Sequence, residues 1–313
     1  MIRGVFTISV PGSTANLGPG FDSVGMAVDR YLTLHVERGD EWRFIPLSEN
    51  LDGIPVGKDN LIYEVATAVA DESGLELPPC EVRMYSDIPM SRGLGSSAAA
   101  IVAGIELANQ LLDLGLSAEA KVRRASVWEG HPDNVAASVY GGLVIGSHRG
   151  DDGTDVVLGG CPEIDIVAVV PSYELKTVVS RDLLPRELAF GEAVKASGVS
   201  NVLVAALLQG RWDLAGKMMS KDFLHQPYRK EVVPELKVAL ELVDSFGDGG
   251  LNVYGASLSG AGPIVLFYTP EDEGSKLVEA LEAGGYFREH ELQVLKADKN
   301  GVSVKMVVGS MEA

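Results

Sequence analysis

The stretch that decides the fold is residues 89–99, Pro89-Met90-Ser91-Arg92-Gly93-Leu94-Gly95-Ser96-Ser97-Ala98-Ala99. Its two glycines let the backbone approach a ligand closely, and the apolar residues that follow predict a helix from Ser97 to Leu112, capped by Gly115. The first N–H groups of a helix have no partner within it, and the helix dipole adds positive partial charge there. The stretch therefore predicts an anion site, most often one for phosphate, and a serine hydroxyl at such a helix start can ligate Mg²⁺.

This loop by itself leaves several interpretations open. A Walker A loop is excluded because no Gly-Lys-Ser or Gly-Lys-Thr occurs anywhere in the chain. Residues 93–98 do match the dinucleotide fingerprint G-x-G-x-x-A, although several residues, including Pro89, separate them from the preceding strand. A serine-capped helix that follows a turn and binds nothing is the third interpretation.

Three further segments carry unusual polar content. Residues 11–22, PGSTANLGPGFD, place hydroxyls, an amide and a carboxylate among glycines directly after a predicted strand. Residues 129–134, EGHPDN, place four polar groups before a pair of glycines, and residues 255–263, GASLSGAGP, are small throughout. Taken singly, each segment is also typical of a turn or a helix cap.

The chain alternates between strand and helix patterns in both halves. Strands are predicted at 5–10 (ended by Pro11-Gly12), 31–37, 81–85, 143–145, 164–170 and 263–268, and helices at 60–70, 97–112, 121–128, 187–196, 201–208, 233–245 and 275–283. A C-terminal hairpin is predicted from 293–297 through Asn300-Gly301 to 302–308. With 313 residues the chain predicts two domains, 1–163 and 164–313.

Composition narrows the class of protein. The net charge of -18 opposes binding to nucleic acid or to anionic membranes. No run of about 18 uninterrupted apolar residues occurs, which predicts that nothing spans a membrane, and the N-terminus lacks the pattern of a signal peptide. Cys80 and Cys161 are far apart and fit no metal spacing, so two buried thiols in a cytoplasmic protein are expected.

Together the glycine-rich segments resemble the GHMP kinases, in which an N-terminal strand and loop, a Pro-x-x-x-Gly-Leu-Gly-Ser-Ser-Ala loop and a C-terminal glycine-rich loop follow in this order. Within that superfamily, residues 13–22, 129–135, 140–142 and 225–229 resemble the homoserine kinase family. The resemblance implies an α+β fold, with an N-terminal domain like domain 2 of ribosomal protein S5 and a ferredoxin-like C-terminal α/β sandwich. It also implies ATP-dependent phosphorylation of the hydroxyl of L-homoserine, with ATP and Mg²⁺ bound, and family members are often homodimers.

The resemblance also implies roles for individual residues. Residues 89–99 would bind the ATP phosphates, Asn60 would lie near the adenine, and Ser97 and Glu129 would hold Mg²⁺. Glu129 directly precedes Gly130-His131, whereas other members place more residues between them. The substrate pocket would be lined by Asn16, Asp22, His131, Asn134, Arg181, Arg229 and Gly260. The two arginines would bind the substrate carboxylate, and Thr177, Asn134 and Arg181 would lie nearest the reacting groups.

The mechanism depends on one position in the central segment. Other GHMP kinases place an aspartate there as catalytic base, and the matching residue here is Asn134, which cannot take a proton at neutral pH. The resemblance therefore implies direct transfer without a protein base. A GHMP kinase for mevalonate, an isoprenoid intermediate or a sugar, a GHMP-fold protein that binds ATP without turnover, and a Rossmann oxidoreductase remain as alternatives.

Overall fold

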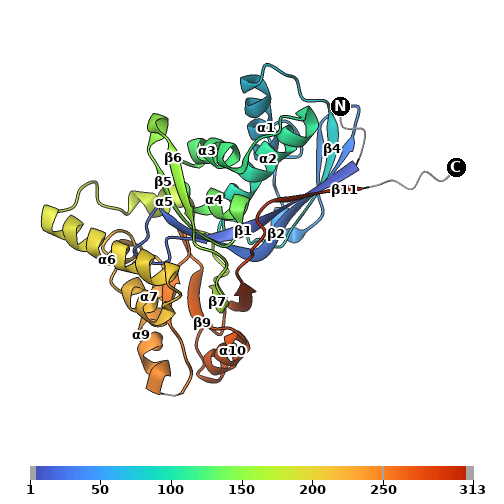
Figure 1. Ribbon diagram of the computed structural model, residues 1–313. Helices are drawn as coiled ribbons and strands as arrows, with labels where there is room; N and C mark the ends of the chain where they lie inside the picture. Colours follow the sequence, from blue (N-terminus) through green and yellow to red (C-terminus); the bar gives the residue numbers. More distant parts are fainter. Residues whose placement is uncertain (1–4, 249, 308–313) are drawn as a thin grey trace.

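The computed structural model describes residues 5–248 and 250–307, which fold into two parts, each a sheet with helices packed on it (Figure 1). The first part contains β1 Val5–Ala15, β2 Val24–Arg38, β3 Arg43–Pro46, η1 Glu49–Leu51, α1 Leu61–Glu72, β4 Cys80–Ser86, α2 Ser96–Leu112, α3 Ala118–Glu129, α4 Asp133–Tyr140, β5 Leu143–His148, η2 Gly150–Asp152 and β6 Thr154–Leu158. There follow β7 Ile164–Val170, α5 Thr177–Asp182, α6 Phe190–Leu208, α7 Trp212–Met219, α8 Gln226–Arg229, α9 Pro234–Asp248, β8 Gly255–Leu258, β9 Val265–Pro270, α10 Gly274–Ala283, β10 Glu291–Lys296 and β11 Ser303–Val307.

The first sheet has the order β11-β1-β2-β4-β3, with β5 paired to the start of β2 and β6 paired to β5. Alternate residues of β1, such as Phe6, Ile8 and Val10, are buried because strand side chains point to opposite faces in turn. Helices α1 to α4 gather on one side of this sheet (Figure 1). β1 continues to Ala15, so the prediction that Pro11-Gly12 ends it is wrong. The pairing with β2 instead shifts register between these two residues and resumes.

The second sheet is antiparallel, in the order β10-β7-β9-β8. Every residue of β7 is buried, because the strand lies between two cores. Ile166 and Ala168 join the core shared with the first sheet, whereas Val167 and Val169 pack into a second core with α9 and α10. This mixed α+β architecture agrees with the fold class predicted from the sequence.

α2 is the central helix, and its small residues allow neighbours to approach closely. A Cβ at Gly104 would lie 2.7 Å from the carbonyl oxygen of Ile62, which places the backbone of α1 directly against this helix. The predicted Gly115 cap is wrong by two positions. Asp113 ends the helix in a left-handed conformation, with φ of 53°, and its N–H donates to the carbonyl of Asn109.

The predicted C-terminal hairpin is wrong. β10 pairs with β7 in the second sheet, while β11 pairs with β1 in the first, so the chain crosses between the sheets at residues 297–302. The Asn300-Gly301 turn does form, with both N–H groups donating to Asp298 Oδ1. The division at residues 163 and 164 therefore needs an amendment, because residues 303–307 add a strand to the first sheet.

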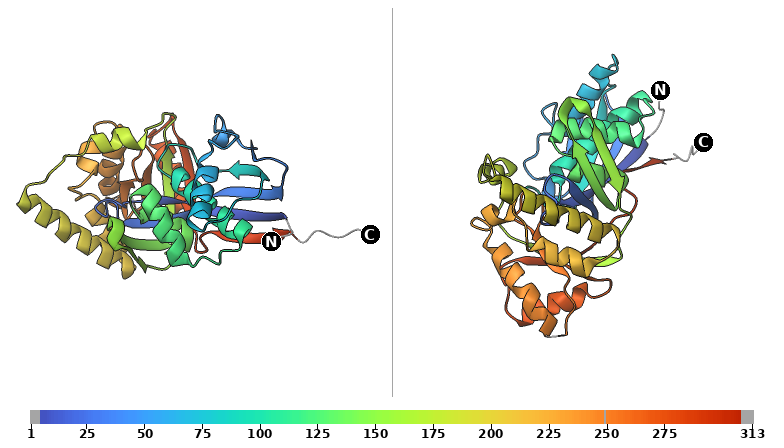
Figure 2. Two further views of the ribbon diagram at one scale, coloured as in Figure 1. Left: turned by 90° about the horizontal axis from the view of Figure 1, so that it is seen from above. Right: turned by 60° about the vertical axis from the view of Figure 1, so that its left-hand side comes forward.

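Two further predictions need correction. The segments 187–196 and 201–208 form one continuous helix, α6, at the edge of the molecule (Figure 2). By length and composition α6 could cross a membrane, and 22% of its most apolar window is buried. Cys80 is buried as expected, but Cys161 is exposed because it lies in the connection between β6 and β7.

Candidate active site

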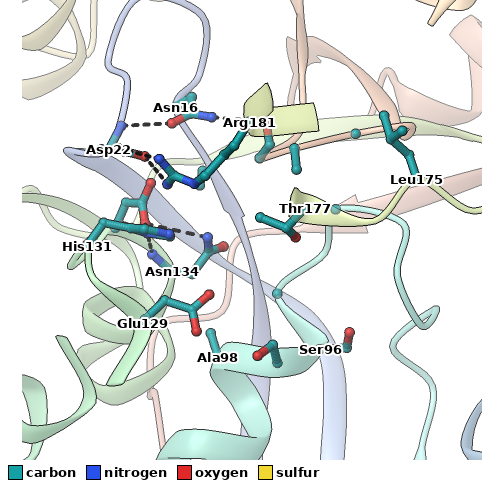
Figure 3. A pocket seen from close by; sticks show the side chains of 18 of the residues that line it. Asn16, Asp22, Ser96, Ala98, Glu129, His131, Asn134, Leu175, Thr177 and Arg181 are labelled. Carbon is teal, nitrogen blue, oxygen red and sulfur yellow. Dashed lines mark hydrogen bonds and ion pairs between the residues drawn. The ribbon is translucent and has the colours of Figure 1, made fainter. Parts of the chain in front are cut away.

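A cavity between the two parts brings together segments that are far apart in the sequence (Figure 3). Its wall is formed by the loop between β1 and β2, the start of α2, the α3–α4 junction, α5, α8 and the loop between β8 and β9. Predicted site residues that line it are Asn16, Asp22, Ser91, Gly93, Gly95, Ser96, Ser97, Ala98, Glu129, His131, Asn134, Thr177, Arg181, Arg229 and Gly260.

At one end of the cavity lies the N-terminus of α2. Gly95 precedes the helix in a left-handed conformation and offers no capping side chain. Within the described residues, the N–H groups of Ser96, Ser97 and Ala98 make no hydrogen bond. Three donors and the positive end of the helix dipole therefore face the cavity, which is the arrangement that binds phosphate oxygens.

The glycine loop is held in place by the second part of the molecule. Ser259, fully buried, donates its hydroxyl hydrogen to the carbonyl of Gly93 at 2.6 Å, and its Oγ lies within hydrogen-bond distance of Thr14 Oγ1, at 2.9 Å. A Cβ on Gly93 would lie 2.3 Å from the Ser259 carbonyl oxygen, at φ of 97°. Glycine is required here because the loop touches backbone from the other sheet and takes a conformation that side chains disfavour.

Beside this helix start lies the carboxylate of Glu129. Glu129 ends α3, and its carboxylate points toward the first turn of α2 (Figure 3). Burial raises the pKa of Glu129, and Asp133 adds to the rise, while His131, Arg181 and a hydrogen bond from Ser97 oppose it. A hydroxyl and a half-buried carboxylate are hard oxygen donors, so these two residues fit Mg²⁺.

The opposite end of the cavity carries three charged side chains, Asp22, Arg181 and Arg229. Arg181 donates to both carboxylate oxygens of Asp22, at 2.8 and 3.1 Å (Figure 3). Arg229 is 2% exposed, and no carboxylate of the described residues forms an ion pair with it. Burial, followed by the charge of Arg181, lowers the pKa of Arg229 to about 10. A desolvated guanidinium of this kind favours an anionic ligand.

Between the two ends lies a chain of hydrogen bonds around Asn134. Its Oδ1 accepts from the buried Ser13 hydroxyl at 3.0 Å, and its Nδ2 lies 3.5 Å from Asp133 Oδ1, a long contact that leaves the second N–H of the amide for a ligand. Asp133 Oδ1 accepts from His131 Nδ1 at 2.6 Å and from the Asn134 N–H at 2.8 Å. Burial alone would lower the pKa of His131, but the hydrogen bond and charge of Asp133, with Asp22 and Glu129, raise it.

A hydrogen bond between Asn16 and Gly260 connects the β1–β2 loop to the β8–β9 loop at the end of the cavity that holds Asp22 and Arg181. Asn16 Oδ1 accepts from the Asp22 N–H, and its Nδ2 donates to the Gly260 carbonyl, both at 3.0 Å. Asn16 and Asp22 both adopt left-handed conformations, which asparagine and aspartate tolerate better than most residues. The Asn16 side chain thereby shapes the pocket wall in addition to facing the cavity.

Some predicted residues lie outside the cavity wall. Asn60 is buried and caps α1, accepting from the Ile62 N–H and donating to the Pro55 carbonyl, so its predicted place near the adenine stays a prediction. Arg92 donates to the carbonyls of Met90, Pro171 and Ser172. The remaining residues of the predicted phosphate loop that do not line the cavity are Pro89, Met90, Leu94 and Ala99.

The cavity wall also includes residues that the sequence analysis missed. Phe21, Asp133 and Leu175 face the cavity, with Ala15, Ala261 and Gly262. Phe21 lies next to Asp22 in residues 11–22, a segment that drew attention for its polar groups alone. Its place beside a predicted site residue could have indicated that it faces the cavity. Leu175 precedes α5, a helix that the sequence patterns did not predict.

Comparisons with known proteins agree on one family. The model described as GHMP kinases N terminal domain matches residues 60–142, and that described as GHMP kinases C terminal matches residues 203–286. A homoserine kinase of Halalkalibacterium halodurans is 53% identical, over 98% of this chain and 97% of that protein. One of Bacillus velezensis is 53% identical, over 95% of this chain and 94% of that protein. The solved structure of a homoserine kinase from Cytophaga hutchinsonii superposes with a TM-score of 0.80 at 26% identity, covering 97% of this chain and 98% of that one.

Proposed function

The chain belongs to the homoserine kinase family of the GHMP kinases, and from this premise we propose how its site binds the substrate and transfers phosphate. The reaction is the ATP-dependent phosphorylation of the side-chain hydroxyl of L-homoserine, which gives O-phospho-L-homoserine and ADP and is a step of threonine biosynthesis. The observation that carries the assignment of the pocket is the Asp22–Arg181 pair beside the buried Arg229, which forms no ion pair with any carboxylate that the structure describes.

We propose that Asp22 binds the α-ammonium of homoserine and that Arg181 and Arg229 bind its carboxylate. Asp22 and Arg181 pair with each other in the structure, and their side chains are 33% and 38% exposed. A pair this exposed contributes only about 0–1 kcal/mol, so the two charges of the substrate can replace it readily. Arg229 then supplies a second cation for the carboxylate, whereas an uncharged sugar would leave that cation without a partner.

At the other end of the cavity, we propose that the free N–H groups of Ser96, Ser97 and Ala98 hold the phosphates of ATP. Ser97 and Glu129 would hold Mg²⁺, which neutralises phosphate charge when bound. Homoserine bound between Asp22 and Arg229 has its hydroxyl end directed away from these charges, toward Asn134 and the start of α2. Phosphoryl transfer depends mainly on such alignment and on charge neutralisation.

We propose that transfer is direct, without a protein base. The Asn134 Nδ2 donor can bind the oxygen of the acceptor hydroxyl, but the amide cannot accept its proton. The hydroxyl proton passes to a γ-phosphate oxygen as the new O–P bond forms and the bond to ADP breaks. Asp133 is the carboxylate that is hydrogen-bonded to Asn134, and three hydrogen-bond donors already share its Oδ1. These contacts suit an aspartate that orients His131 and Asn134.

The test is ADP release with Mg·ATP and L-homoserine, mevalonate, galactose or no acceptor. Turnover with homoserine alone is expected. Turnover with another acceptor would keep the kinase activity but overturn homoserine as the substrate of the pocket. ATP binding without turnover would favour a regulatory protein. Alanine variants of Asp22, Arg181 and Arg229 should each raise KM or lower kcat for homoserine while the KM for ATP stays unchanged. An unchanged kcat/KM in all three would overturn the pocket assignment.

We propose that the protein is a cytoplasmic homodimer without a membrane segment, and that the exposed face of α6 lies in the dimer interface. Phe190, Val194 and Val202 on this face are 86%, 56% and 40% exposed. Glu192 and Lys195 are the only charged residues of α6, so two copies of a chain of net charge -18 repel each other least there. Sedimentation of Val194→Glu should show a monomer, whereas an unchanged dimer would exclude this face.

A further inference from the structure

We propose that Phe21 is a positioning residue for the substrate carboxylate, because its ring holds the guanidinium groups of Arg181 and Arg229 side by side. This inference rests on the proposed assignment of both arginines to that carboxylate. Phe21 lies in the loop between β1 and β2, while the arginines come from α5 and α8. The ring centroid is 5.6 Å from Cζ of Arg181 and 5.4 Å from Cζ of Arg229.

The arrangement answers an electrostatic problem in the pocket. Two guanidinium groups that share one anion must stay close together before the anion arrives, although they repel each other. Asp22 neutralises Arg181, but no carboxylate of the described residues pairs with Arg229. The face of an aromatic ring attracts cations through its quadrupole, and one ring within about 6 Å of both groups attracts both. Phe21 therefore offsets the repulsion without using up either arginine's hydrogen-bond donors.

His225 fixes the other side of this cluster. Its ring stacks on Phe21, with centroids 5.3 Å apart and planes 22° apart. Burial lowers the pKa of His225, so the ring is neutral, and its Nε2–H donates to the Gly18 carbonyl at 2.9 Å. Nδ1 is then the acceptor for Arg229 Nη1, at 3.1 Å. The histidine thus ties Phe21 and Arg229 to the loop that carries Phe21.

The remaining contacts of Arg229 leave one donor group for a ligand. Its Nε and Nη1 donate to the carbonyls of Ser180 and Gly260, at 3.4 and 3.0 Å, and Nη1 also meets His225. Within residues 5–248 and 250–307, Nη2 makes no hydrogen bond, and Arg229 lines the cavity. The orientation of the Arg229 guanidinium group is therefore fixed before a ligand binds, and Nη2 can donate to a carboxylate oxygen.

A plain apolar role for Phe21 predicts a different outcome. If the ring served only as a wall against the methylene groups of the substrate, leucine would replace it with little effect. If the π face holds the arginines, substitution by leucine or methionine should weaken homoserine binding, whereas substitution by tyrosine should preserve it. Phe21 is half-buried in a surface loop, so none of these changes removes a core residue.

The experiment compares Phe21→Leu, Phe21→Met and Phe21→Tyr with the wild type in steady-state kinetics. We expect the leucine and methionine variants to raise KM for L-homoserine about fivefold to tenfold, while kcat and the KM for ATP change less than about twofold. Phe21→Tyr should stay within about twofold of the wild type. Melting temperatures of all variants should agree, because the contact positions the pocket and does not hold the fold.

A second substrate separates carboxylate recognition from general damage. L-homoserinol replaces the carboxylate by a CH₂OH group, so it cannot use the two arginines. The ratio of kcat/KM for homoserine to kcat/KM for homoserinol should be smaller in Phe21→Leu than in the wild type, and it should be unchanged in Phe21→Tyr. An unchanged preference in Phe21→Leu, or an equal loss in Phe21→Tyr, would overturn the inference. A wild type that does not phosphorylate homoserine would instead overturn the proposed function.

Discussion

Replacing Asp133 by asparagine separates direct transfer from transfer assisted by a base. Asp133 is 1% exposed, and its Oδ1 accepts from His131 Nδ1 at 2.6 Å and from the Asn134 N–H at 2.8 Å. Asparagine has nearly the same shape and keeps an oxygen that can accept both bonds. The substitution therefore removes a charge and a possible proton acceptor while it leaves the local geometry in place.

The two mechanisms predict losses of different size. A general base contributes a factor of about 10²–10⁴ to the rate, so its removal should lower kcat by that factor. In direct transfer, Asp133 only orients its neighbours, and the change weakens a charge-assisted hydrogen bond to a neutral one. That difference is about 1 kcal/mol, and it lowers kcat about fivefold if the whole loss is felt in the transition state. We expect the smaller effect.

The assay is kcat at saturating Mg·ATP and L-homoserine from pH 6 to 9, with KM values and melting temperatures. Asp165→Asn is the matched control, because Asp165 is also buried, at 3% exposed, and accepts from the Gly274 N–H far from the cavity. It should change stability but not kcat. A drop in kcat of about 100-fold or more for Asp133→Asn, with both KM values and the melting temperature unchanged, would refute direct transfer.

Three further outcomes are expected. Glu129→Gln should require more Mg²⁺ for half-maximal rate, yet without nucleotide its melting temperature should not fall, because burial already disfavours the charged carboxyl and raises its pKa; a lower melting temperature would contradict this. Since burial lowers the pKa of His225, only the unfolded chain takes up a proton as pH falls below about 6.5, so stability to urea should decline in that range for the wild type and less for His225→Gln; parallel declines would exclude His225 as the source. Gly93→Ala should lower the free energy of unfolding by about 2 kcal/mol or more and abolish ATP binding, because its Cβ would meet the Ser259 carbonyl; Gly53→Ala, with φ of 78° and open space around it, is the control for backbone strain alone.

Local patterns in the sequence predicted the elements that depend on local physics. The helix predicted from Ser97 begins one residue earlier, at Ser96, because a run of small and apolar residues after two glycines specifies a helix start almost by itself. The strand at 164–170 was predicted with the bounds that the structure gives. All of β7 and most of α2 from Ala98 to Asn109 are buried, and continuous apolar character is visible without knowing the neighbours.

Pairing between distant segments could not be predicted in this way. Alternation at 302–308 does indicate a strand, but periodicity does not say which sheet receives it, and β11 joins the first sheet beside β1. The Asp22–Arg181 pair likewise joins residues 159 positions apart. Asn60 is a different case. It was predicted only to lie near the adenine, and the structure shows in addition that it is the N-cap of α1, a position that asparagine favours.

The contacts around Gly260 support the proposal that alignment takes the place of a base in this site. Its carbonyl accepts from Asn16 of the loop between β1 and β2 and from Arg229, and its N–H donates to the Ala15 carbonyl. The preceding residue, Ser259, binds the carbonyl of Gly93 in the phosphate loop. Adjacent residues of one segment thus connect the end of the cavity proposed to bind homoserine, at Asn16 and Arg229, to the end proposed to bind the ATP phosphates, at Gly93. Because phosphoryl transfer gains most from in-line positioning of acceptor and phosphate, a rigid link between the two ends favours direct transfer.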